Sequence, residues 1–140
     1  MVLLPEERAI LYNSYKKVAA AGPVLTDLFY RHLFEIDPSL RALFPASMAM
    51  QGVKFRLKLN FILLAIDQPD NLAEILRTLG ERHTGYGVKP EDYPKFAESV
   101  LWAVKQYLDF AYTPEVDAAW RKLFAVINKL STHSDTGETA

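Results

Sequence analysis

The spacing of prolines constrains the fold of this chain more than any other feature of the sequence. Eight prolines occur in 140 residues. Seven of them stand near the start of a segment whose apolar residues recur every three to four positions. Proline is tolerated in the first turn of an α-helix but disrupts the interior, where it removes a hydrogen bond and clashes with the preceding turn. The prolines therefore predict a series of separate helices.

The predicted helices cover most of the chain, and nothing in the sequence competes with them. Their expected ranges are 5–20, 24–36, 38–43, 48–66, 70–83, 90–112 and 114–130. No segment alternates apolar and polar residues as a half-buried strand would, and no Asn-Gly or Asp-Gly pair marks a hairpin turn. The sequence predicts an all-α fold of about seven helices in one domain, residues 1–130. We expect residues 131–140 to form a polar, disordered tail.

Composition excludes several classes of site and partner. The formal net charge is −1, which gives no bulk attraction to nucleic acid or to anionic membranes. The absence of cysteine excludes disulfides, thiolate metal sites and thioether-linked cofactors. The longest apolar run, at 61–66, is far shorter than the roughly 20 residues of a membrane span. We expect a soluble cytoplasmic protein with no nucleic-acid or membrane partner, either a monomer or a weak homodimer.

His83 is the residue whose position most suggests chemistry. It ends the predicted helix 70–83 and precedes a glycine-containing turn and a proline. The other two histidines, His32 and His133, are far from it in sequence, so the pattern does not indicate a cluster of histidine ligands. A lone histidine at a helix end can be a cation that stabilises the helix dipole. It can also be one axial ligand to a flat cofactor that apolar side chains hold in place.

Five motifs, taken in order, make the sequence resemble the globin family, and within it the bacterial single-domain globins and the haem domains of flavohaemoglobins. They are FYRHLF at 29–34, LFP at 43–45, a long helix that begins near Gln51, LGERHTGYGV at 79–88 and EDYP at 91–94. The resemblance covers about residues 6–130. It implies a globin fold around one non-covalently bound haem b per chain.

The resemblance also implies a role for each of the motif residues. His83 matches the proximal histidine, which binds haem iron through a neutral imidazole nitrogen. Tyr30 and Gln51 match a distal tyrosine and glutamine, whose O–H and N–H groups can donate hydrogen bonds to a gas molecule. Phe44 matches the corner phenylalanine that stacks on haem. Tyr93 matches a tyrosine beside the proximal histidine.

Two positions depart from the family pattern. Phe55, one helical turn after Gln51, replaces the usual aliphatic residue, and we expect it to face the iron and narrow the route for a gas. The glutamate that flavohaemoglobins place near the proximal histidine has no clear counterpart, although Asp135 falls near its place. The expected apolar walls of the haem pocket are Leu59, Leu79, Val88, Phe96 and Val100. The candidates to pair with haem propionates are Lys54, Arg56 and Arg82.

The first functional hypothesis is a haem protein that reversibly binds dioxygen and other diatomic gases, including carbon monoxide and nitric oxide. The second is a nitric oxide dioxygenase, which would need a separate reductase to return its iron to the ferrous state. A third hypothesis is a haem-based gas sensor. A fourth is an all-α protein that binds a hydrophobic ligand without haem.

Overall fold

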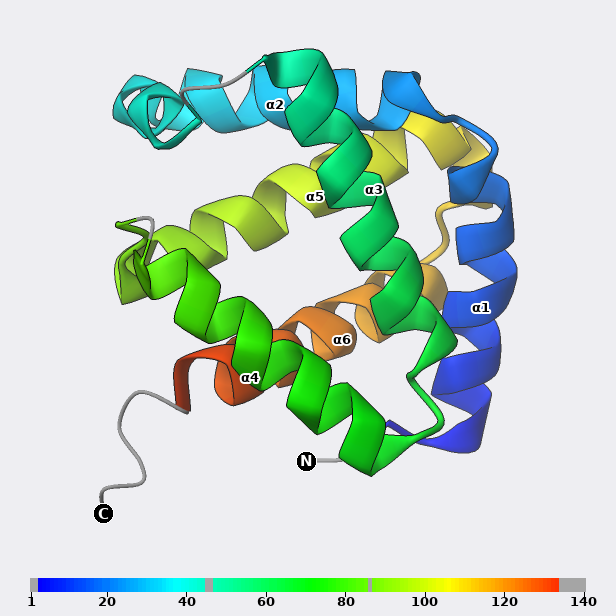
Figure 1. The fold of residues 1–140 in the computed structure, drawn as a ribbon. Helices are drawn as coiled ribbons and strands as arrows, with labels where there is room; N and C mark the ends of the chain where they lie inside the picture. The colour runs from blue at the N-terminus through cyan, green and yellow to red at the C-terminus, as the bar shows by residue number, and fades with distance from the viewer. Residues whose placement is uncertain (1–2, 45–46, 86, 134–140) are drawn as a thin grey trace.

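Six α-helices and three short 3-10 helices make up the part of the chain that the structure describes, residues 3–44, 47–85 and 87–133 of a computed structural model (Figure 1). The α-helices are α1 (Pro5–Ala19), α2 (Pro23–Ile36), α3 (Met48–Leu64), α4 (Pro69–Gly85), α5 (Tyr93–Leu108) and α6 (Pro114–His133). The 3-10 helices are η1 (Pro38–Leu43), η2 (Pro90–Asp92) and η3 (Asp109–Ala111). The predicted all-α fold is confirmed.

Local signals in the sequence begin most of these helices. Helices α1, α2, α4 and α6 each begin at a proline, as the spacing predicts. Gly22 precedes α2 with a φ of +57°, in the left-handed region that glycine adopts without steric cost. The Asp37 carboxylate accepts from the Ser39 amide at 3.1 Å at the start of η1, and the Thr113 hydroxyl accepts from the Val116 amide at 3.2 Å at the start of α6. Both satisfy amides that the first helical turn leaves without a backbone partner.

The predicted single helix 90–112 consists of three elements. The first is η2, the second is α5, and the third is η3. The break after α5 lies at Asp109, whose φ of 55° cannot continue a right-handed helix. At its far end the chain stays helical for longer than predicted, because α6 continues past residue 130 to His133. Residues 134–140 of the expected tail lie outside the described residues.

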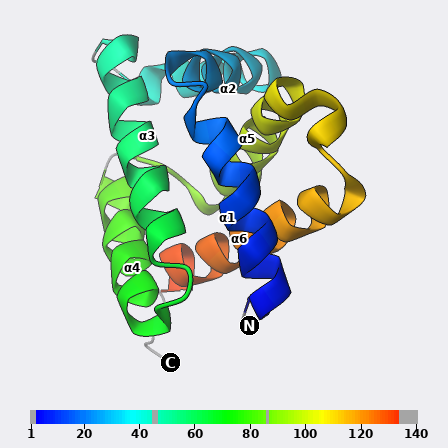
Figure 2. The ribbon, with the colours of Figure 1, turned by 90° about the vertical axis from the view of Figure 1, so that its right-hand side faces the viewer.

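The core lies where α6 packs against α1, α4 and α5, and where α2 packs on α5 (Figures 1 and 2). Trp120 of α6 is fully buried, and its indole N–H donates to the Ser14 hydroxyl of α1 at 2.9 Å. A buried N–H without a partner would cost free energy, so this bond allows a large polar-edged ring to fill the centre. The other fully buried large side chains are Leu11, Val18, Leu33, Leu63, Leu76, Val100, Val104 and Leu123.

Candidate functional site

His83 is held in the last turn of α4, against the start of α5. Its backbone carbonyl accepts from the Val88 amide at 2.9 Å, which fixes the turn that leaves the helix. Its ring centroid lies 6.1 Å from that of Tyr93, the first residue of α5, with the ring planes tilted by 50°. Tyr93 in turn meets Phe96 edge to face at 6.2 Å. His83 of α4 and the two α5 residues packed beside it, Tyr93 and Phe96, are here called the α4 group. They form one side of the candidate site.

The imidazole of His83 is kept neutral by its surroundings. The side chain is half-buried, and burial lowers the pKa of His83 below its usual value, with a further lowering from the positive charge of Lys58. The Nδ1 atom is buried and has no hydrogen-bond partner among the described residues. A neutral imidazole retains a lone pair that can bind a metal. His83 is therefore in the protonation state that a metal ligand requires.

Aromatic side chains from α2, η1 and α3 form the opposite side of the site. Tyr30 lies between two phenylalanines, with its ring centroid 4.8 Å from Phe29 and 5.3 Å from Phe44. Phe34 is 5.9 Å from Tyr30 and 5.8 Å from Phe44. Phe55 of α3 stacks on Phe29 at 4.6 Å. The five residues, here called the α2 aromatic group, bring together three residues that the sequence analysis singled out: Tyr30, Phe44 and Phe55.

Tyr30 is the one ionisable side chain in the α2 aromatic group. It is only 8% exposed, and burial raises its pKa to about 12, with a small opposing effect from Arg56. The phenol therefore keeps its proton at neutral pH. A neutral phenol can donate one hydrogen bond, which makes Tyr30 a donor in an otherwise apolar setting.

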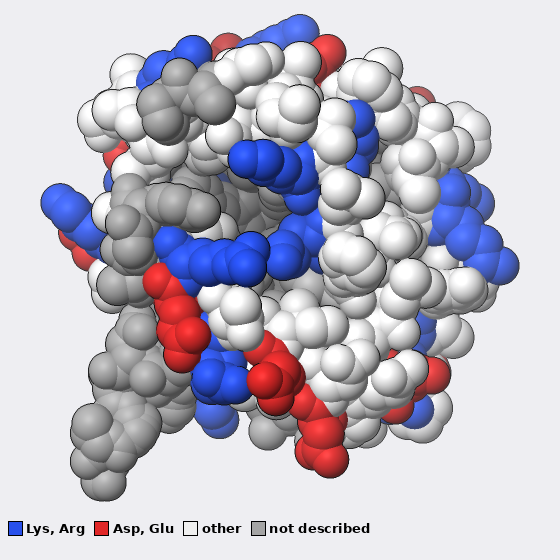
Figure 3. Space-filling view, in the orientation of Figure 1, with Lys and Arg blue, Asp and Glu red and all other residues white. Residues whose placement is uncertain are grey.

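The surface is hollowed between these two sides. Figure 1 shows α2, η1 and the start of α3 on one side, with the end of α4 and the start of α5 on the other. In the same orientation, Figure 3 shows a hollow in this face, and Lys and Arg side chains extend across its opening. Asp37 at the end of α2 accepts from the ammonium of Lys95 on α5 at 2.6 Å, and this ion pair joins the two sides at one edge.

The other predicted site residues are distributed between the core and the rim. Leu59 and Val100 are buried in the core, whereas Leu79, Val88 and Phe96 are half-buried. Gln51 is half-buried in the first turn of α3, and Lys54 and Arg82 are exposed. Asp135 lies outside the described residues.

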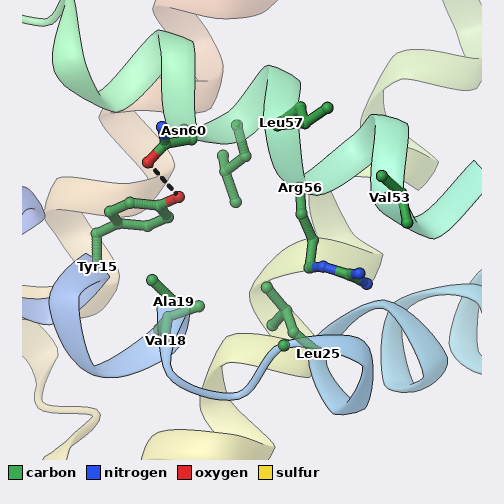
Figure 4. A pocket seen from close by; sticks show the side chains of 10 residues that line it. Tyr15, Val18, Ala19, Leu25, Val53, Arg56, Leu57 and Asn60 are labelled. Atoms are coloured by element: carbon green, nitrogen blue, oxygen red, sulfur yellow. Dashed lines mark hydrogen bonds between the residues drawn. The ribbon is translucent and has the colours of Figure 1, made fainter.

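The Arg56 side chain forms a hydrogen bond outside the candidate site. Its guanidinium donates to the Thr26 hydroxyl at 2.8 Å, and the side chain lines a separate pocket between α1 and α3, next to Leu25 (Figure 4). In this position Arg56 bonds within the protein, whereas Lys54 and Arg82, the other two candidates to pair with a propionate, are exposed.

Sequence reasoning missed Lys58 as part of the site. Lys58 was not among the candidate residues, but it is half-buried and its charge acts on His83. The signal was its spacing, because residues three, four and seven positions apart share a helix face. Gln51, Phe55 and Lys58 follow that spacing, so all three lie on one side of α3.

The described residues contain neither a cluster of metal-binding side chains nor a membrane-spanning helix. Within residues 3–44, 47–85 and 87–133, no three His, Asp or Glu side chains gather closely enough to hold a metal ion by themselves. No helix in this part of the chain combines the length and the apolar character needed to cross a bilayer.

Comparisons with known proteins agree with this arrangement. Residues 27–130 match the family model for Globin. The chain is 31% identical over 129 residues to a flavohemoprotein of Xylella fastidiosa, covering 90% of this chain and 32% of that protein. It is 31% identical over 109 residues to a flavohemoprotein of Bacillus subtilis, covering 76% of this chain and 27% of that protein. The chain thus spans about a third of the length of these relatives.

A solved structure shows the same fold. The crystal structure of a hexacoordinated heme protein from an anhydrobiotic tardigrade superposes with a TM-score of 0.85 and covers 93% of both chains, at 16% sequence identity. At this identity the likeness concerns the arrangement of the helices.

Proposed function

Because the chain belongs to the globin family, we propose that it binds one haem b in the hollow between the α4 group and the α2 aromatic group, and that it reversibly binds dioxygen and other diatomic gases there. The observation that carries the proposal is the state of His83. Its ring is neutral and half-buried, and its Nδ1 atom is buried without a partner among the described residues. A buried polar atom normally has a partner, so the site fits a group that the described residues do not supply.

The residues around the hollow suit a flat apolar cofactor with two acidic groups at one edge. His83 would bind the iron, and Phe44 would stack on the ring system. Leu59, Leu79, Val88, Phe96 and Val100 would provide apolar walls, while Tyr93 would support the imidazole from the start of α5. The exposed cations Lys54 and Arg82 would pair with the propionates.

When bound, haem supplies iron with a coordination position that a diatomic gas can take. Tyr30 and Gln51 would then donate hydrogen bonds to the gas from a neutral phenol and an amide N–H. Donors that are already in place in a site that excludes water stabilise developing negative charge at little reorganisation cost. Phe55 would narrow the space above the iron. Together, two donors and a narrow pocket are expected to slow gas release.

Two histidine variants test the proposal. The purified protein should be red with a strong Soret band, and His83→Ala should lose haem or its bond to the protein. His32→Ala is the matched control, because His32 is also half-buried but its Nδ1 lies 3.1 Å from the Ser99 hydroxyl and its ring stacks on Trp102. That variant should keep the spectrum. Normal dioxygen binding by His83→Ala would contradict the assignment.

Nitric oxide dioxygenation is the second candidate, and the similarity to flavohemoproteins supports it. The reaction combines dioxygen with nitric oxide to give nitrate and leaves the iron oxidised, so a separate cytoplasmic reductase would have to donate an electron in each turnover. Stopped-flow mixing of the oxygenated protein with nitric oxide should show a fast spectral change and stoichiometric nitrate. A slow reaction, or failure of every added flavin reductase with NADH to reduce the ferric protein, would favour simple gas binding.

A further inference from the structure

Helix α3 exposes a second apolar face that no other described segment covers. Five apolar side chains, Met50, Val53, Leu57, Phe61 and Leu64, form this face, here called the α3 ridge. Each is between 41% and 54% exposed. They recur at intervals of three, four, four and three residues, which places them on one side of the helix. The opposite side of α3 buries Leu59, Ile62 and Leu63 in the core.

The α3 ridge is large for the surface of a monomer. A half-exposed large apolar side chain presents on the order of 100 Å², so the five together expose roughly 500 Å². That value is at the upper end of the largest apolar patch on a typical monomer, and patches of this size often mark interaction sites. The ridge itself contains no charged residue.

The apolar surface continues from the ridge into the neighbouring pocket. Val53 and Leu57 line a pocket of about 360 Å³ whose other walls include Val18 and Leu25 (Figure 4). A standard protein–protein interface buries about 800 Å² on each partner. The ridge alone therefore supplies a little more than half of that area, and the adjoining pocket extends the apolar surface.

The spacing of the ridge is symmetric about Leu57. Met50 and Leu64 lie seven residues on either side of it, and Val53 and Phe61 lie four residues on either side. A two-fold axis beside Leu57, perpendicular to the helix, would therefore pack the ridge of one copy against the same ridge of a second copy, with the two helices antiparallel. Met50 would meet Leu64, the small Val53 would meet the large Phe61, and Leu57 would meet itself. An isologous contact requires this kind of self-complementary surface.

We propose that the α3 ridge is the interface of a homodimer, in which the α3 helices of two copies pack antiparallel across a two-fold axis at Leu57. Lys54 and Lys58 each follow a ridge residue and therefore lie along one flank of the ridge. The two-fold axis keeps like flanks together, so lysines of both copies line the same edge of the interface. Salt should screen their repulsion and tighten the dimer.

Engineered cysteines test the geometry directly, because the natural chain has none. Leu57→Cys should form an interchain disulfide on mild oxidation of dilute protein, because residues on the axis lie within disulfide reach. Phe110→Cys is the control, since Phe110 is 92% exposed on η3 and lies outside the ridge. It should cross-link only slowly, by random collision.

A mixed experiment tests the direction of the helices. Met50→Cys combined with Leu64→Cys should give a heterodisulfide between the two variants. Each variant alone should cross-link poorly, because like positions would lie about 21 Å apart along an antiparallel pair at 1.5 Å per residue. Preferential cross-linking of Met50→Cys to itself would overturn the antiparallel arrangement.

Sedimentation of the haem-loaded protein over a wide concentration range tests the dimer itself. Leu57→Lys should raise the dissociation constant by about 30-fold or more, because the new charges would face each other at the centre of the interface. Phe110→Lys, with the same change of side chain, should not. Added NaCl should tighten the natural dimer.

The same lysine-flanked apolar face could instead bind a lipid surface, and two results would overturn the dimer in favour of that partner. The first is a natural chain that sediments as a monomer at millimolar concentration. The second is co-sedimentation with phosphatidylcholine–phosphatidylserine vesicles that NaCl weakens and Leu57→Glu abolishes.

Discussion

At the scale of single residues, Tyr30 is a donor whose proton is protected by its surroundings. Burial raises its pKa to about 12, whereas a phenol in the unfolded chain titrates near 10. Folding therefore favours the protonated form. The stability that this contributes is present below pH 10 and is lost as the pH rises from 10 towards 12.

We predict that the dioxygen dissociation rate stays constant from pH 7 to about pH 10.5. Over this range the Tyr30 phenol remains protonated and able to donate, while an ordinary tyrosine would have lost much of its proton at the upper end. Stopped-flow displacement of dioxygen by carbon monoxide at a series of pH values measures this. A rate that rises with a midpoint near pH 10 would show that Tyr30 titrates as an exposed phenol.

Tyr30→Phe should raise the dioxygen dissociation rate by about 10- to 150-fold. Removal of one hydrogen bond to a partly charged acceptor costs roughly 1.5–3 kcal/mol. Tyr15→Phe is a matched control, because the Tyr15 hydroxyl donates to the Asn60 side chain at 3.1 Å in the separate pocket between α1 and α3. An equal change in both variants would show that the effect is not specific to the haem pocket.

Phe55→Leu should speed the association of carbon monoxide, because a smaller side chain would widen the space above the iron. Flash photolysis measures the rate. Phe110→Leu makes the same change at an exposed residue of η3 that lies outside the hollow and the α3 ridge, and it should leave the rate unchanged. An unchanged rate in Phe55→Leu would indicate that the ring stays on Phe29 and away from the gas.

The sequence singled out as site candidates those residues whose type is unusual for their position. It did not single out residues whose role depends on neighbours that only the fold brings together. His83 stood out because a histidine ends an amphipathic helix, and Tyr30 because it lies in an aromatic motif. Lys58 was not singled out, since only the tertiary fold brings its charge near His83. The hydrogen bond from Arg56 to Thr26 spans two helices and leaves no pattern in the sequence.

At the scale of helices, α4 is positioned by a backbone contact at Gly80. A Cβ atom at this residue would lie only 1.8 Å from the carbonyl oxygen of Ser131 on α6. The absence of a side chain therefore allows the last turn of α6 to lie directly on α4. Gly80 lies one turn before His83, so the same contact sets the position of the imidazole.

Gly80→Ala should destabilise the protein by about 2–3 kcal/mol, because the methyl group would push α6 away from α4. Urea unfolding measures the loss. Gly52→Ala is the control, since its Cβ would lie 3.0 Å from the Thr26 hydroxyl oxygen, a much milder contact. The higher helix propensity of alanine offsets part of that cost, so the stability should change by less than about 1 kcal/mol. Equal stability of the two variants would mean that α4 and α6 separate at little cost.

Helix positions were predictable from proline spacing and apolar periodicity, but helix ends were less so. The break at Asp109 was missed because neither glycine nor proline marks it, although this exposed residue has a φ of 55°. Helix α6 was predicted too short because Ser131 is polar, although it is fully buried against α4. At Ser131 the contact with α4 outweighs the local sequence signal.

At the scale of the whole molecule, the proposed haem site implies that the two sides of the hollow depend on the cofactor, whereas the opposite side of the fold does not. The α1–α6 contact is completed by protein groups alone, with the Trp120 indole bonded to Ser14. The α4 group and the α2 aromatic group are the walls that haem would fill. Stability in a protein is rarely uniform, and regions with few contacts open first.

Removal of haem should therefore loosen the start of α3 and the end of α4 more than α1 and the centre of α6. Hydrogen exchange with mass spectrometry on the haem-loaded and haem-free forms measures this peptide by peptide. A bound ligand also stabilises the whole fold by mass action, so the midpoint of thermal unfolding should fall as well. An even loss of protection across all helices would argue against a haem site between the two groups.

Helix α3 presents Gln51 and Phe55 on the same side as the proposed haem and the α3 ridge on the other. If gas binding shifts this helix, the strength of self-association must differ between the gas-bound and gas-free protein. Linkage then requires the converse, a gas affinity that differs by the same factor between dimer and monomer. This coupling would appear as a change in gas affinity when the protein is diluted from dimer to monomer, and the measurement needs no label and no substitution.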